Sequence, residues 1–98
     1  MTSNIVKPKV IAEETESFSF PFTPTKPGIC MVSVNPSSTS ASFLEVTRNG
    51  KSLVFTGSGG GVGHSCTFGV EAGITYSLGS SSTNYGTLKT NYMALNVS

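Results

Sequence analysis

A chain of 98 residues is long enough for one domain with a single core, but not for a core that also holds a deep catalytic cleft. Charged residues make up only 11% of the chain and the net charge is +1, so Ser, Thr, Gly and Asn supply the polar surface. The few cations are scattered, which argues against nucleic-acid binding, and all five acidic residues are Glu, which weakens any calcium or metal site. We expect no cofactor.

The N-terminal residues hold no apolar run of signal-peptide or membrane-spanning length, so we expect synthesis in the cytoplasm and no membrane insertion. Residues 5–11 have strand-like composition but contain Pro8, which is tolerated only at a sheet edge. We therefore predict that residues 1–16 form an arm or an edge strand, and that residues 17–98 form the folded domain.

Short segments in which apolar and polar residues alternate follow one another along the rest of the chain. Alternation with period two places one set of side chains on one face of a β-strand. The expected strands are 18–22, with Phe18, Phe20 and Phe22 on one face, then 29–34, 43–48, 51–56, 64–70 and 74–78, and a last strand in which Met93, Leu95 and Val97 have the core parity. No segment has helical periodicity, so the sequence predicts an all-β protein.

Turn signals separate these strands at roughly ten-residue intervals. Residues 21–28 hold three prolines and one glycine, Asn49-Gly50 is the strongest β-hairpin signal, and two polar loops are expected at 57–63 and 79–86. Seven or eight short strands at this spacing are typical of a single antiparallel β-sandwich with jelly-roll-like topology.

No group of residues indicates catalysis. Residues 57–63 are glycine-rich but match neither a P-loop nor a dinucleotide-binding motif, and no GxSxG motif or paired carboxylates occur. His64 is the only histidine, and its spacing from Cys66 would allow a Cys–His catalytic pair on one face of the strand. Cys66 has the same parity as Phe68, however, which favours a core role for Cys66. We predict no enzyme activity.

Cys30 and Cys66 each lie on the apolar face of their strand, which favours reduced, buried thiols over a disulfide bond. Recognition is expected in the long loops. In the 79–86 loop, Tyr85 can stack on a sugar or anchor an interface, or can instead fold back over the sheet edge. The candidate contact residues are Tyr85, Asn84, Ser81, Ser82 and Thr83.

The order FTPTKPG, ICMVSV, TRNG and FGVEAGITYSLGS, between residues 22 and 80, resembles small β-domains of phage and prophage fibre proteins. These domains are similar to the jelly rolls of the complement globular head and tumour necrosis factor class, which commonly form trimers. The resemblance implies a virion structural and receptor-binding module, such as a tail-fibre tip, a head fibre or a capsid-decorating subunit. It also implies that the chain forms a homotrimer and contacts other virion proteins or a host surface glycan or protein. The alternative is a bacterial carbohydrate-binding or adhesion module.

Overall fold

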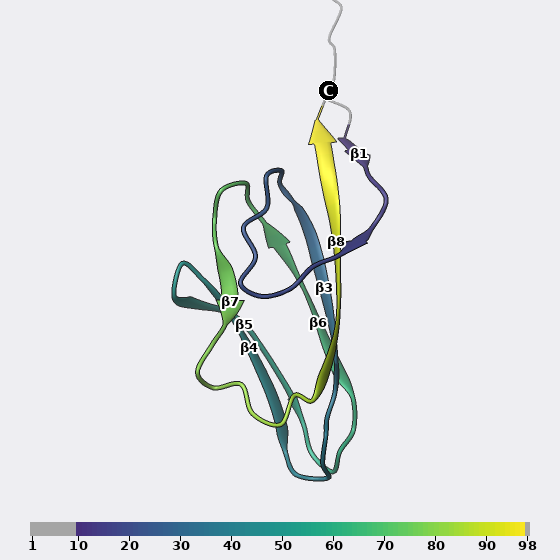
Figure 1. Ribbon diagram of the computed structural model, residues 1–98, viewed down its shortest axis with the longest axis vertical. Coiled ribbons are helices and arrows are strands. Elements are labelled where there is room, and N and C mark those ends of the chain that lie inside the picture. The colour runs from purple at the N-terminus through teal and green to yellow at the C-terminus, as the bar shows by residue number, and fades with distance from the viewer. Residues whose placement is uncertain (1–9, 98) are drawn as a thin grey trace, which may run out of the picture.

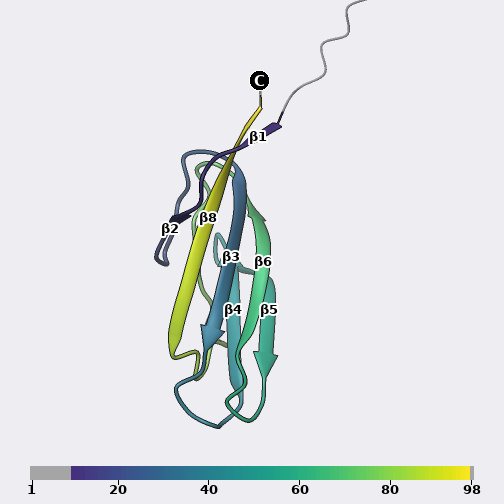
Figure 2. The same ribbon diagram turned by 90° about the vertical axis from the view of Figure 1, so that its right-hand side faces the viewer.

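The computed structural model describes residues 10–97, which form eight strands and no helix. The strands are β1 (Val10–Ala12), β2 (Glu16–Ser17), β3 (Gly28–Asn35), β4 (Ser42–Arg48), β5 (Lys51–Ser58), β6 (His64–Val70), β7 (Tyr76–Leu78) and β8 (Thr87–Val97). They make two antiparallel sheets packed face to face, an elongated β-sandwich (Figures 1 and 2). The predicted all-β sandwich is confirmed.

One sheet has the order β1-β8-β3-β6, with β2 also paired to β8, and the other has the order β5-β4-β7. Phe22 extends the second sheet because its backbone pairs with Tyr76 of β7. The chain changes sheets after β3, β5, β6 and β7, which gives the interlocked connections of a jelly roll.

The core lies between the sheets and follows from the alternation of each strand. Its buried side chains are Cys30, Val32, Val34, Leu44, Val46, Phe68, Val70, Tyr76, Tyr92 and Ala94. β4 and β5 meet at the Asn49-Gly50 turn, where φ is 49° at Asn49 and 83° at Gly50, as the sequence predicts for a type I′ turn.

The predicted parity of the last strand is wrong. Tyr92 and Ala94 are buried, whereas Met93 and Leu95 lie on the opposite parity and are only half-buried. The pairing with β3 decides this, because Tyr92 lies opposite the buried Cys30 and residues directly opposite each other share a face. Val97 was the third residue of that set, and its side chain lies outside the described part of the structure.

The predicted strand at 18–22 is also wrong, because regular pairing ends at Ser17 and the chain then bends at Phe20 and Pro21. Proline has no N–H for a sheet ladder, so the segment crosses from one sheet to the other instead of continuing along β8. Its three phenylalanines pack on one another, with ring centroids of Phe18 and Phe22 4.6 Å apart, and they cover the open edge of the sandwich.

The N-terminal segment runs along the free edge of β8. Val10 pairs with Val97 and Ala12 with Leu95, and two residues of β2 then pair with Asn91 and Tyr92. Glu13 fixes this strap, since its carboxylate accepts hydrogen bonds from Lys26 and Asn96. The remainder of the arm or edge strand predicted at 1–16, residues 1–9, lies outside the described residues.

Candidate functional site

The 79–86 loop, in which the sequence places the contact residues, is tied to its surroundings. Asn84 has φ of 49° and its amide nitrogen donates to the carbonyl oxygens of Ser38 and Ser40, at 3.2 and 3.1 Å. Its side-chain oxygen accepts a hydrogen bond from Ser37 at 2.9 Å. The Asn84 side chain therefore joins two loops and has little capacity left for a ligand.

The middle of this loop pairs with β4. The backbone of Thr83 exchanges two hydrogen bonds with Phe43, at 2.8 and 2.9 Å, and the hydroxyl of Ser82 accepts a hydrogen bond from the Glu45 N–H at 3.0 Å. The hydroxyl-bearing residues Ser81 and Thr83 are exposed, whereas Ser82 is half-buried. The loop thus extends the β5-β4-β7 sheet beyond the end of β7.

Tyr85 is half-buried and packs against the core. Of its two sequence-based interpretations, this position agrees with a side chain that folds over the sheet edge. Ser81 and Thr83 are then the predicted contact residues that remain most open to solvent.

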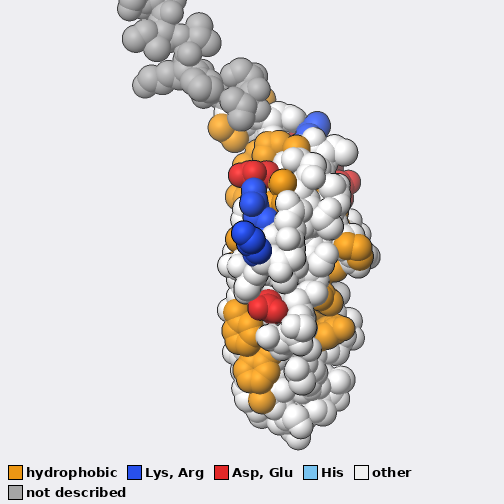
Figure 3. Space-filling model, turned by 90° about the vertical axis from the view of Figure 1, so that its left-hand side faces the viewer, with side chains coloured by type: hydrophobic (Ala, Val, Ile, Leu, Met, Phe, Trp, Pro, Cys, Tyr) orange, Lys and Arg blue, Asp and Glu red, His pale blue; other side chains and the backbone are white. Residues whose placement is uncertain are grey.

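An exposed pair of aromatic rings lies on the outer face of β4 and β5, next to this loop. The rings of Phe43 and Phe55 are stacked, with centroids 5.6 Å apart and an interplanar angle of 24°. They are 37% and 56% exposed, and Leu53, on the same strand as Phe55, is 39% exposed. Figure 3 views this side of the molecule and shows hydrophobic side chains beside an acidic group.

These rings are not among the contact residues expected from the sequence, although the alternation of β4 contains a signal for them. Phe43 shares its parity with Glu45 and Thr47, the outward-facing residues of β4. An aromatic side chain on the polar face of a half-buried strand is the pattern that indicates a contact surface.

Glu45 is held in place beside the rings. It lies directly opposite Phe55 in the β4–β5 register, and its carboxylate accepts a hydrogen bond from the Ser81 N–H at 3.4 Å. The carboxylate also packs against the bare backbone of Gly79, where any added Cβ would overlap with it. A half-buried carboxylate is therefore fixed between the aromatic rings and the 79–86 loop.

His64 makes a hydrogen-bonded cluster that links the two sheets. Its Nε2 lies 2.8 Å from the hydroxyl of Ser42, and its Nδ1 lies 3.3 Å from the hydroxyl of Thr56. Because the Thr56 hydroxyl donates to the carbonyl of Ser65, its oxygen can accept a hydrogen bond from Nδ1–H, which leaves Nε2 to accept a hydrogen bond from the Ser42 hydroxyl.

The serine of this serine–histidine pair is closed to substrates. Ser42 has no exposed surface, so a substrate cannot reach its hydroxyl. The structure does not favour a catalytic pair of His64 and Cys66 either. Burial raises the pKa of the Cys66 thiol, whereas a nucleophilic cysteine needs a lowered pKa. Both cysteines are free and Cys30 is buried, as predicted, whereas Cys66 is only half-buried.

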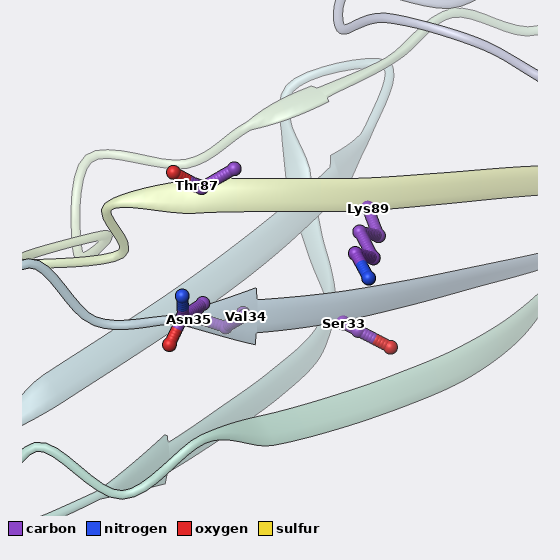
Figure 4. A pocket seen from close by; sticks show the side chains of 5 residues that line it. All are labelled: Ser33, Val34, Asn35, Thr87 and Lys89. Atoms are coloured by element: carbon purple, nitrogen blue, oxygen red, sulfur yellow. The ribbon is translucent and has the colours of Figure 1, made fainter.

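Two hollows lie elsewhere on the surface. One, of about 230 Å³, lies on β3 and β8 and is lined by Ser33, Val34, Asn35, Thr87 and Lys89 (Figure 4). Lys89 extends from β8 toward β3 and is its single charged group. The other, of about 200 Å³, lies at the edge covered by the Phe18–Phe22 segment and is lined by Phe18, Ser19, Phe20, Leu78, Leu88 and Thr90.

No protein-family model, curated protein or solved structure matches this chain. Within residues 10–97, no three His, Cys, Asp or Glu side chains are grouped so that they could hold a metal ion. The described part of the chain also has no helix with the length and hydropathy needed to cross a bilayer.

Proposed function

We propose that this chain is a non-enzymatic structural and binding module of a virion, for example a fibre tip, a head fibre or a capsid-decorating subunit. Two features of the chain support the proposal. The turn pattern resembles small fibre domains, and the polar surface, rich in hydroxyl groups and low in charge, suits a module that contacts neighbouring proteins and glycans.

The observation that carries this proposal is that the ends of the described chain and the long loops lie at opposite ends of the sandwich. Val10 and Val97 are paired, so both ends of the described chain leave the sandwich at the same end (Figure 1). The loops at 36–41 and 59–63 lie at the opposite end, and Asn84 joins the first of them to the 79–86 loop. A domain with its chain ends at one pole and joined loops at the other is suited to attachment at the first and contact at the second.

The attachment pole carries exposed apolar side chains. β1 pairs with the last residues of β8, which extend beyond the end of β3, and makes a two-stranded ribbon whose Val10 and Ile11 are 59% and 46% exposed. An isolated two-stranded ribbon is only marginally stable in water. A second copy of the chain, or another virion protein, would cover both faces of the ribbon, and the resemblance to fibre domains favours a homotrimer.

Light scattering of the purified chain at high micromolar concentration tests this association. We expect a trimer mass for the wild type and a lower mass for the double variant Val10→Ser/Ile11→Ser. The matched control is Val62→Ser, which removes an equally exposed side chain, 61% exposed, from the opposite pole and should leave the mass unchanged. A monomer mass for the wild type would contradict the trimer.

The genes next to the one that encodes this chain test the virion assignment. Tail or capsid genes would support it, whereas a polysaccharide locus would favour the alternative, a bacterial carbohydrate-binding or adhesion module. Both alternatives need a contact surface, so the gene context tests the location of the protein and not its mode of binding.

A further inference from the structure

The outer face of β4 and β5 offers an exposed aromatic surface. The ring of Phe43 lies over Gly57, where an added Cβ would come within 2.6 Å of the ring. The missing side chain at Gly57 allows the Phe43 ring to lie against the strand and to stack with Phe55. The two stacked rings are both exposed and together form one continuous aromatic surface.

The border of this surface carries fixed polar groups. Glu45 lies directly opposite Phe55 in the β4–β5 register, and its carboxylate reaches Gly79 and Ser81 of the 79–86 loop. The backbone N–H of Ser81 donates a hydrogen bond to one oxygen of the Glu45 carboxylate. The second carboxylate oxygen can accept a hydrogen bond from a ligand. The exposed hydroxyls of Ser81 and Thr83 lie on the same loop.

We infer that the Phe43–Phe55 surface, bordered by Glu45 and Ser81, binds a neutral saccharide. The face of a pyranose ring that carries C–H groups packs on aromatic rings, while its hydroxyls, which are hydrogen-bond donors, match a fixed carboxylate. The inference rests on the proposed binding role and names both its site and its ligand class.

The charge of Glu45 favours a saccharide over the other occupants. A second copy placed on this face would bury the carboxylate against an apolar surface, and an unpaired buried charge is costly. An acidic saccharide would bring a like charge next to the same carboxylate. A neutral saccharide covers the rings and also supplies hydrogen-bond donors to Glu45.

The test begins with an array of neutral and acidic oligosaccharides. We expect wild-type protein to bind neutral saccharides, and an array on which it binds none overturns the inference. A saccharide that binds on the array is then titrated against the protein in solution, which gives the affinity of a single site. Phe55→Ser should weaken binding at least about tenfold, the loss expected when a central aromatic contact is removed.

Two further variants test whether this surface is a specific saccharide site or only an apolar patch. Gly57→Ala keeps both rings but displaces Phe43, so it should also weaken binding. Glu45→Gln keeps the shape of the side chain and removes its charge, so it should weaken neutral saccharides and reduce the discrimination against acidic ones. Circular dichroism establishes that each variant is folded. Unchanged binding in Phe55→Ser overturns the inference, as does a Phe55→Ser variant that changes only the oligomer mass.

Ile11→Ser is the matched control, because it removes an exposed apolar side chain at the other pole. It should leave the affinity for the saccharide unchanged. If the Val10→Ser/Ile11→Ser variant alters the oligomer mass while saccharide binding is absent in all variants, the proposed assembly role stands and the saccharide site is wrong.

Discussion

At the residue scale, the polar groups inside the sandwich are few and each has a partner. Ser42 is the one buried polar residue found among residues 10–96, and its hydroxyl bonds to His64. Because Ser42 belongs to β4 and His64 to β6, this bond connects the two sheets. A histidine that the sequence marks only as a strand end therefore contributes to the packing of the fold.

We expect Ser42→Ala to lower the free energy of unfolding by about 1 kcal/mol, the net value of one intramolecular hydrogen bond. The half-buried His64 can recover a bond to water, which limits the loss. Urea denaturation measures the change, and Ser65→Ala, an exposed serine on β6, serves as the control. Equal or greater stability in Ser42→Ala would show that the bond between the sheets contributes nothing.

The buried thiol of Cys30 gives a pH dependence. Burial raises its pKa from 9.0 to about 12, so between these values the folded state binds more protons at this site than the unfolded state. This contribution to stability is complete below about pH 9 and is lost as the pH rises toward 12. We expect the urea midpoint to fall between about pH 8 and about pH 10.5, and to fall less in Cys30→Ala. A reductant should leave the midpoint unchanged, and a decrease would reveal a disulfide.

At the element scale, two short segments fix the strands on either side of them. The Asn49-Gly50 turn sets the register of β4 and β5, and the strap of β1 and β2 covers the edge of β8. The first depends on backbone conformation, and the second is held in part by side-chain charge.

We expect Gly50→Ala to destabilise the protein by about 1–2 kcal/mol, because an alanine at a φ of 83° places its Cβ too close to the backbone. Thermal or urea unfolding measures the loss. Gly59→Ala is the matched control, since Gly59 has open space around it and no positive φ, and it should change stability little. Equal effects at the two positions would contradict the type I′ geometry.

The strap should loosen in acid. Hydrogen bonds from Lys26 and Asn96 lower the pKa of Glu13 below its ordinary value of 4.5, so its contribution is complete above that value and is lost as the pH falls through the lowered pKa. The backbone N–H of Glu13 donates to the carbonyl of Ala94, which makes its NMR resonance a direct probe of the pairing. We expect this resonance to shift toward its unpaired position in acid, and Glu13→Gln to remove most of the pH dependence. The same titration in Glu14→Gln should match the wild type.

At the scale of the whole molecule, a sandwich needs its open edges closed. Phe22 closes one of them, with its backbone paired to β7 and its ring 5.0 Å from the ring of Tyr92 on β8. The side of β5 and β6 is closed by a hydrogen bond from the Thr56 hydroxyl to the Ser65 carbonyl. Phenylalanines therefore have two roles in this protein, since some close the core and others lie exposed on the β4–β5 face.

We expect Phe22→Ala to lower the free energy of unfolding by roughly 2–4 kcal/mol, because it opens a cavity beside Phe18 and Tyr92. Phe55→Ala should change it by less than about 0.5 kcal/mol, as is usual for exposed positions. Urea denaturation compares the two. Similar losses for both would mean that Phe22 does not close the edge of the core.

The sequence predicted the features that depend on residues close together in the chain. Alternation in 29–34, 43–48 and 64–70 identified β3, β4 and β6 and their buried faces, because burial on one face of a strand requires that pattern. The Asn49-Gly50 turn was predicted correctly, because few residues other than glycine and asparagine accept a positive φ. Together these local signals determined the all-β class and the β-sandwich.

Tertiary structure decided the features that depend on pairing between distant residues. Register with β3 turned Tyr92 and Ala94 inward, although Met93 and Leu95 are the more apolar set in the sequence. The same long-range pairing brought the 79–86 loop onto β4, where it binds Glu45 and leaves Phe43 and Phe55 exposed beside it. Alternation along one strand shows only that the two faces of that strand differ in composition. The neighbouring strand, far away in the sequence, determines which face meets the core and which residues share a surface.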